Sequence, residues 1–349
     1  MRDSRRARLR AAFLCAVFIL PAMPAAAQEN VVNVYSYRQP ELIQPLLDAF
    51  TEETGVATQV IFADTGLEER IKAEGANSPA DVILTVDISR LQAAEDAGVT
   101  QPLDDETIEA NIPAQYRDPE GNWFGVTTRG RVVYASKDRV EQDSITYEEL
   151  ADPKWKGRIC TRSGQHVYNI GLISSMIAHH GVEETEKWLQ GVKDNLAVKP
   201  SGGDRDQAKL IAAGECDIAL GNSYYVGLMR TNEKEPEQKE WAAAIKVLFP
   251  NAAERGSHVN ISGMALAANA PHKADAVKLM AFLAGDEAQR IYAEANNEYP
   301  LGPGIAVSET VASFGELKLD PLPLAEIAAH RKEASELVDE VGFDNGPSS

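Results

Sequence analysis

The sequence has few basic residues, and this shortage excludes several classes of partner. Its 349 residues include 34 lysines and arginines against 53 aspartates and glutamates, a net charge of −19. Without residues 1–27, which contain five arginines and Asp3, 29 basic and 52 acidic residues remain and the net charge is −23. Such a chain is repelled by nucleic acid and by anionic membranes, so we expect it to bind neither.

Long apolar runs are equally scarce, and the one that exists lies at the start of the chain. Several arginines precede an apolar stretch over residues 11–23, and three alanines at 25–27 form a small-residue cleavage site. This pattern predicts a signal peptide over residues 1–27, cleaved before Gln28, and export to the periplasm. No other stretch is long and apolar enough for a transmembrane helix, so we expect a soluble mature protein with no direct membrane insertion.

The same leader bears on the export route. Arg5 and Arg6 resemble the pair of a twin-arginine signal. However, Arg8 stands where such signals usually carry an apolar residue. We therefore favour the Sec route over the twin-arginine route.

Motifs for catalysis and for nucleotide binding are missing. No Gly-x-Gly-x-x-Gly follows the first predicted strand, and the chain has no phosphate loop, no nucleophile elbow and no His-Glu-x-x-His. No pair of acid and base residues has a suitable spacing for general acid-base chemistry. We therefore expect that the protein is not an enzyme.

Cysteine is also rare, with three residues in the whole chain. Cys160 and Cys216 are the two that remain after the leader, and an even count in an exported chain predicts one disulfide. Both lie in short apolar runs that read as strands, and neighbouring strands of one sheet bring such residues within range. Two buried free thiols are the alternative.

Strands and helices alternate along the chain, which indicates the fold class. The first part of the chain predicts three strands with helices between them, the pattern of a mostly parallel sheet covered by helices. A length of 349 residues exceeds what one core comfortably uses, so we predict an α/β protein of two lobes. Two long extended runs, 123–134 and 258–267, are expected to cross between the lobes.

The predicted lobes and elements are as follows. The first lobe is placed at residues 28–128 and 255–302, and the second at 129–254 and 303–349. Strands are predicted at 31–36, 56–62, 81–85, 123–134, 157–161, 216–220, 243–249 and 258–267. Helices are predicted at 41–53, 67–74, 88–97, 147–150, 183–192, 207–213, 274–283, 287–296 and 324–341, with a further one that reaches His179.

Two adjacent tyrosines, Tyr224 and Tyr225, follow the predicted strand 216–220, at the kind of strand end where open α/β sheets bind ligands. Neighbours in an extended segment point to opposite sides, so both reach one ligand only if the chain turns there. The flanking glycines and Asn222 permit such a turn. Tyr168 lies beside another strand end of the second lobe, from which it could join them. The alternative is that all three are ordinary half-buried tyrosines.

Three converging phenols suit more than one ligand. A sugar or a polyamine stacks on aromatic faces, which also attract cations. A hard trivalent metal ion is the more specific interpretation, because hard cations prefer oxygen ligands. Such a cation also holds phenols in the deprotonated form, although the free phenol has a pKa of about 10. Three phenolates balance the charge of Fe3+. A bound carbonate would then add a charge of about −2, which nearby positive groups must balance.

Arginines from the first lobe or the crossing strands provide candidates for that offset. Arg38, Arg129 and Arg131 could face the tyrosines, and the planar fork of arginine suits a two-oxygen anion. Loop amides around Ser163 and Gly164, at a helix start, also favour an anion. For each arginine taken alone, a solvated or structural role is the alternative.

Seven motifs, in order along the chain, resemble those of periplasmic ferric-ion-binding proteins, the substrate-binding components of iron ABC importers. The resemblance covers nearly all of the mature chain. The motifs are Tyr35-Ser36-Tyr37-Arg38-Gln39-Pro40, Ser78-Pro79-Ala80-Asp81-Val82, Asp87-Ile88-Ser89-Arg90, Trp123-Phe124-Gly125, Asp152-Pro153-Lys154-Trp155-Lys156-Gly157, Asn222-Ser223-Tyr224-Tyr225 and His258-Val259-Asn260-Ile261-Ser262-Gly263.

The resemblance implies a two-lobed, transferrin-like clamp of the periplasmic-binding-protein fold that closes on iron by a hinge. It implies Tyr168, Tyr224 and Tyr225 as metal ligands. Some members add a His-Tyr pair from the first lobe, but here Gln39 and Pro40 stand at those positions. The chain thus resembles the three-tyrosine subgroup, in which carbonate or another small anion completes the coordination.

The remaining assignments follow from the same resemblance. Arg38 and Arg129 are expected to bind the carbonate, and Tyr37 and Gln39 are the remaining first-lobe candidates, as ligand or as neighbours of the ligands. His166 is expected to be a surface residue or a neighbour of the ligands, because histidine prefers softer metals.

The expected partner of this monomer is the inner-membrane ABC permease of an iron importer. The alternative function is an ABC importer binding protein for an organic cation or an oxyanion.

Overall fold

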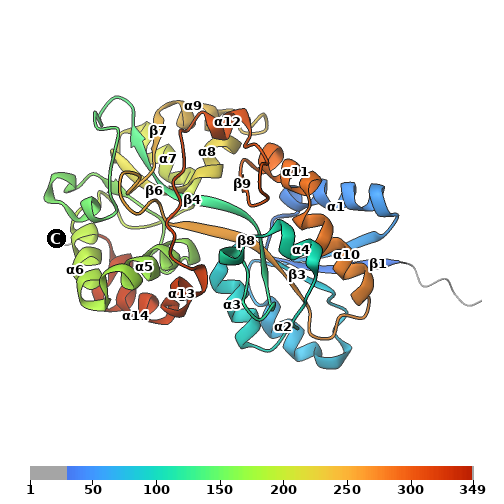
Figure 1. The fold of residues 1–349 in the computed structure, drawn as a ribbon. Coiled ribbons are helices and arrows are strands. Elements are labelled where there is room, and N and C mark those ends of the chain that lie inside the picture. The colour runs from blue at the N-terminus through green and yellow to red at the C-terminus, as the bar shows by residue number, and fades with distance from the viewer. Residues whose placement is uncertain (1–29, 348–349) are drawn as a thin grey trace, which may run out of the picture.

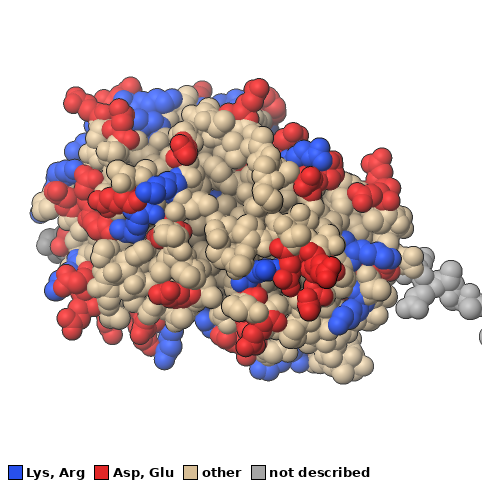
Figure 2. Space-filling view, viewed as in Figure 1, with Lys and Arg blue, Asp and Glu red and all other residues tan. Residues whose placement is uncertain are grey.

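The structure, a computed structural model, describes residues 30–347 as two α/β lobes on either side of two crossing strands (Figure 1). The predicted signal peptide lies outside the described residues. Within residues 30–347, no helix combines the length and the apolar character that crossing a membrane requires. On the face shown in Figure 2, acidic side chains cluster over both lobes with basic side chains between them.

One nine-stranded sheet runs through the molecule in the order β2-β1-β3-β8-β4-β6-β5, with β7 and β9 also paired to β4. The strand β4 connects the lobes because it changes partner between two consecutive residues: Gly130 pairs with Val259 of β8, and Arg131 pairs with Asn222 of β6. The strands are β1 (Val31–Ser36), β2 (Ala57–Phe62), β3 (Val82–Thr85), β4 (Phe124–Ser136), β5 (Ile159–Cys160), β6 (Ile218–Asn222), β7 (Ile245–Leu248), β8 (Val259–Leu266) and β9 (Tyr299–Pro300).

The first lobe is built on parallel strands β2, β1 and β3, as the alternation of strands and helices predicts. Strand β8 then adds antiparallel to β3. The helices bury one large apolar cluster against this sheet, in which Leu46, Leu47 and Phe50 of the first helix are fully buried. The first-lobe helices are α1 (Pro40–Thr54), α2 (Leu67–Glu74), α3 (Ile88–Asp96), α4 (Glu106–Asn111), α10 (Lys273–Ala284) and α11 (Asp286–Asn296).

The second lobe places β6 between β4 and β5 and holds two apolar clusters. One cluster centres on the helix that follows β5, and the other lies around Tyr134 and the half-cystines. The helices of this lobe are α5 (Val167–His180), α6 (Val182–Asp194), α7 (Asp204–Ala213), α8 (Ser223–Arg230), α9 (Glu237–Ala243), α12 (Glu309–Ala312) and α14 (Arg331–Val341).

The last predicted helix, 324–341, is wrong as a single element. The chain forms α13 (Leu324–Ala329) and α14, separated at His330. Leu324 and Ile327 pack into the first-lobe cluster, whereas Leu337 packs into a second-lobe cluster. Because the apolar faces of α13 and α14 pack into different cores, the helix is interrupted between them. The apolar residues follow a helical period on both sides of His330, so the sequence pattern does not reveal the interruption.

The predicted disulfide is confirmed. Cys160 at the end of β5 is bonded to Cys216 just before β6, with the two Cα atoms 5.9 Å apart. Since β5 and β6 are parallel neighbours, the bond links two adjacent strands of the second lobe.

Candidate metal and anion site

The paired tyrosines lie in the first turn of α8, directly after β6. The strand passes into the helix at Ser223, so the turn that the sequence requires is present. Instead of diverging, the rings of Tyr224 and Tyr225 lie with centroids 4.2 Å apart and planes inclined by 31°. The conversion from strand to helix is what brings two neighbouring phenols to one place.

Tyr168 approaches the pair from the first turn of α5. All three tyrosines line a cavity of about 400 Å³ that Tyr37, Arg38 and Gln39 line from the first lobe. The N-termini of α5 and α8 both lie at this cavity, and the positive end of a helix favours a negative group such as a phenolate. The structure thus brings together the three candidate ligands that the sequence indicates.

The environment of Tyr224 and Tyr225 disfavours their ionised form. Burial raises the pKa of Tyr224 well above its ordinary value, and the nearby Tyr168 and Tyr225 raise it further. Burial and Tyr168 also raise the pKa of Tyr225. Conversion of these groups to phenolates therefore needs a strong cation, because the protein's own environment disfavours their charge.

Arg38 and Arg129, the two candidate anion-binding residues, meet behind the tyrosines. Both are almost completely buried, and the Nη1 atom of each donates to the Ser262 hydroxyl, at 2.8 Å from Arg38 and 3.0 Å from Arg129. Their Nε and Nη2 atoms are buried without a hydrogen-bond partner among the described residues. Each arginine therefore keeps one complete two-donor edge for a two-oxygen anion.

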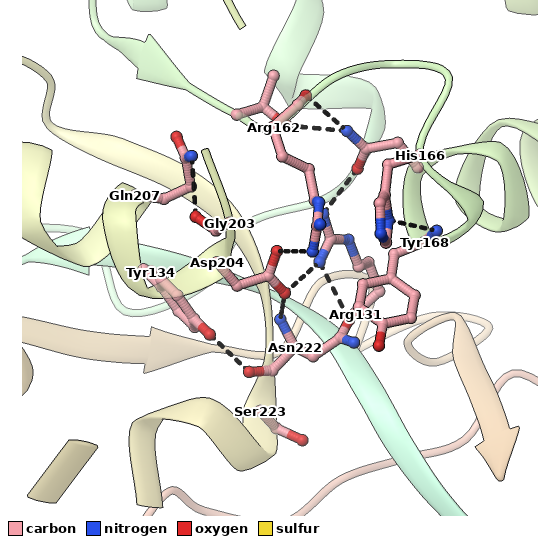
Figure 3. A network of polar contacts seen from close by, with 12 residues as sticks. Arg131, Tyr134, Arg162, His166, Tyr168, Gly203, Asp204, Gln207, Asn222 and Ser223 are labelled. Atoms are coloured by element: carbon pink, nitrogen blue, oxygen red, sulfur yellow. Dashed lines mark hydrogen bonds and ion pairs between the residues drawn. The ribbon is translucent and has the colours of Figure 1, made fainter. Parts of the chain in front are cut away.

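Arg131, the third arginine considered, is already occupied. Its guanidinium contacts Asp204 at 2.8 Å, Asn222 at 3.0 Å and Asn169 at 2.7 Å, and Arg162 reaches the other oxygen of Asp204 at 3.2 Å. Figure 3 shows this network beside Tyr168. Although burial alone raises it, the two arginines hold the pKa of Asp204 below its usual range. Arg131 thus stabilises the packing of the second lobe through these contacts.

The amides around Ser163 and Gly164 do not form the anion site that the sequence suggests. The Gly164 amide donates to Asp344 Oδ1 at 2.7 Å, and the Ser163 hydroxyl contacts the same carboxylate. A carboxylate from the C-terminal segment therefore already occupies these donors.

The first-lobe candidates hold different positions at the cavity. Tyr37 lies under Arg90, whose Cζ is 4.0 Å from the ring centroid, and its hydroxyl contacts Glu68 and accepts from the Leu67 amide at 2.8 Å. Burial, followed by Glu68, raises the pKa of Tyr37. Gln39 precedes α1 as an exposed residue. The Tyr37 hydroxyl is thus engaged within the first lobe, and Gln39 is free to face the cavity.

His166 lines the cavity as the residue that caps α5. Its Nδ1 accepts from the Tyr168 amide at 3.2 Å, and its ring lies edge-on to Tyr168 with centroids 4.6 Å apart. Burial, followed by Arg162, lowers the pKa of His166 to about 3. This neutral imidazole therefore positions the backbone of Tyr168 with one nitrogen.

Three residues with polar roles at the site were not singled out by the sequence: Ser262, Asp204 and Glu298. Glu298 is fully buried, pairs with Arg38 Nη1 at 2.7 Å, and accepts from the Thr127 hydroxyl. Within residues 30–347, no group of three or more His, Cys, Asp or Glu side chains has the arrangement of a metal site. Phenols are the most numerous side-chain oxygen donors that line the cavity, and Asp64 adds one carboxylate.

Comparison with known proteins places this geometry in a family. The profile of the bacterial extracellular solute-binding proteins matches residues 46–318. The chain belongs to this family. Solute-binding proteins are expected to carry a ligand between two lobes, which is where the cavity lies.

Similar members of the family are named for iron. The chain is 41% identical over 325 residues to iron uptake protein A1 of Synechocystis, which covers 93% of this chain and 90% of that protein. A ferric binding protein of Bordetella is 54% identical, with a TM-score of 0.84 over 90% of this chain and all of that one. A Trichodesmium protein solved with iron and citrate ligands is 42% identical, with a TM-score of 0.85 over 90% and 99% of the two chains. These solute-binding proteins share the two-lobed fold predicted from the sequence.

Proposed function

We propose that this solute-binding protein captures Fe3+ with the phenolates of Tyr168, Tyr224 and Tyr225. The observation that carries the proposal is the convergence of three phenols, from the starts of two helices, on one cavity beside two buried arginines. A trivalent hard cation offsets the cost of ionising Tyr224 and Tyr225, whose pKa values are raised by burial. The iron-related names of its relatives support the same ligand.

A synergistic anion completes the site in this proposal, and carbonate is our first choice. The unpartnered Nε and Nη2 donors of Arg38 and Arg129 support an anion with two-oxygen edges next to the metal. The citrate of the Trichodesmium relative is a second anion with such edges. Gln39 and Tyr37 line the cavity from the first lobe, and in this proposal they are neighbours of the complex.

The transport setting completes the proposal. The protein acts in the periplasm as a monomer that delivers iron to the inner-membrane ABC permease of an importer, and it performs no catalysis. The lobes at residues 28–128 with 255–302, and 129–254 with 303–349, are proposed as the two units that close on iron. The change of partner in β4 at Gly130 supports a boundary close to residue 129.

The direct test is an absorbance titration. Addition of Fe3+ with bicarbonate should produce a visible phenolate-to-iron charge-transfer band, and Tyr224→Phe or Tyr225→Phe should weaken iron binding by at least about tenfold, the equivalent of 1.4 kcal/mol. Tyr116→Phe is the matched control, since Tyr116 is buried in the first lobe away from the cavity. An absent band together with unchanged affinity in the tyrosine variants would contradict the proposal and favour an organic cation or an oxyanion.

A further inference from the structure

Arg38, which lines the cavity, and Arg129, which lies beside Tyr168, do not offer equal charge to an anion, because Arg38 forms an ion pair. Arg38 Nη1 lies 2.7 Å from Glu298 Oε1, and both side chains are buried. The other oxygen of Glu298 accepts from the Thr127 hydroxyl on β4. Arg129 has no ion pair within the described residues. The buried carboxylate of Asp87 accepts from the Ser89 amide and from Asn260.

The ion pair with Glu298 thus reduces the total positive charge of Arg38 and Arg129, but the two arginines keep their free hydrogen-bond donors. Glu298 and Ser262 together engage the Nη1 atom of Arg38, and Ser262 also engages Nη1 of Arg129. The Nε and Nη2 edges of both arginines remain without partners. An anion therefore meets two complete two-donor edges but a net formal charge closer to +1 than to +2.

We infer that Glu298 determines which anion charge the site accepts, by cancelling the charge of Arg38 while leaving its Nε and Nη2 donors without a partner among the described residues. This inference rests on the proposed function, since the anion binds beside the metal. A fully buried counter-charge disfavours a dianion about twice as strongly as a monoanion of the same size, because the Coulomb energy scales with the charge of the ligand. Glu298 contacts neither metal nor anion in this role and acts through Arg38.

The test compares two anions of similar size and different charge, glycolate and oxalate. Glu298→Gln is nearly isosteric and removes only the charge, so we expect the ratio of oxalate to glycolate affinity to rise by about tenfold or more. Both affinities are measured by calorimetry on the metal-free protein and by the shift of the charge-transfer band on the iron-loaded protein. Asp81→Asn is the control, because Asp81 is an equally buried carboxylate of the first lobe, bonded to Asn33 and His272.

A second variant separates charge from packing. Arg38→Gln combined with Glu298→Gln removes one positive and one negative charge, so both anions should bind more weakly while their affinity ratio stays within about twofold of that of the wild type. An unchanged ratio in Glu298→Gln, or a change as large in Asp81→Asn, would overturn the inference. If the single variant does not fold, a changed ratio in the double variant overturns it. A wild-type protein without any iron-dependent band would instead overturn the proposed function.

Discussion

At the scale of single residues, the protonation of the phenols governs how the site responds to pH. Burial and Tyr168 raise the pKa of both Tyr224 and Tyr225, so these side chains carry their protons in the metal-free protein at neutral pH. A metal that binds phenolate must displace those protons. Acid therefore competes with the metal, and the competition extends over the whole pH range below the raised pKa values.

We expect Fe3+ binding at pH 7 to release about one proton for each coordinating phenol, and the apparent affinity to fall as the pH is lowered. A pH-stat titration, with iron supplied as a chelate of known protonation, measures this number. Tyr224→Phe should release about one proton fewer than the wild type. Equal proton release from both proteins would show that Tyr224 is not a ligand.

The sequence reveals some site residues and conceals others for a physical reason. The tyrosine pair and Arg38 stand out because they occur in short local motifs beside strand ends. Asp204, Ser262 and Glu298 make contacts with residues 73, 133 and 171 positions away, respectively. Each of them resembles an ordinary polar residue of its own segment, so only the folded chain assigns it a partner.

At the scale of elements, the regular strands and helices follow from local pattern. The predicted run 123–134 is the strand β4, and most predicted helices differ from the observed ones by a few residues at their ends. Helices α4, α9 and α12 were not predicted because they are short and carry few buried apolar positions. Helix α8 was not predicted either, since the sequence indicates only a turn after the strand that precedes the tyrosines. The packing of α13 and α14 against different cores depends on tertiary contacts that periodicity does not contain.

The disulfide between β5 and the start of β6 should stabilise the second lobe without contributing to the ligand site. Replacing Cys160 and Cys216 together by alanine should lower the free energy of unfolding by about 2–4 kcal/mol. Iron affinity should remain within about twofold of the wild type, since neither cysteine lines the cavity. Urea unfolding and the absorbance titration measure the two effects. A large loss of affinity with unchanged stability would contradict this separation.

At the scale of the whole molecule, ligand binding between two lobes predicts a change in shape. The tyrosines belong to the second lobe, whereas Arg38 lies between β1 and α1 and Ser262 lies on β8. An anion held between them links the lobes through the metal. The apolar cores of the two lobes are otherwise largely separate clusters, so each lobe is suited to move as a unit.

Loading with Fe3+ and bicarbonate should therefore reduce the radius of gyration by on the order of 1 Å, as two lobes close around the ligand. Small-angle X-ray scattering of the metal-free and loaded forms measures this change. Tyr116→Phe should close as the wild type does, whereas a variant with all three cavity tyrosines changed to phenylalanine should not. If the triple variant still closes when iron is added, the closure of the lobes does not depend on the three phenol groups.

The change of partner in β4 has a mechanical consequence. Arg129 is bonded to Ser262 on one side of the crossing and Arg131 to Asp204 on the other, and Gly130 alone separates them. Two residues of strand span about 7 Å. In the closure that we propose, β4 is expected to bend near Gly130, between two arginines that are each fixed to one lobe, and a few degrees of rotation there would displace the outer helices much further.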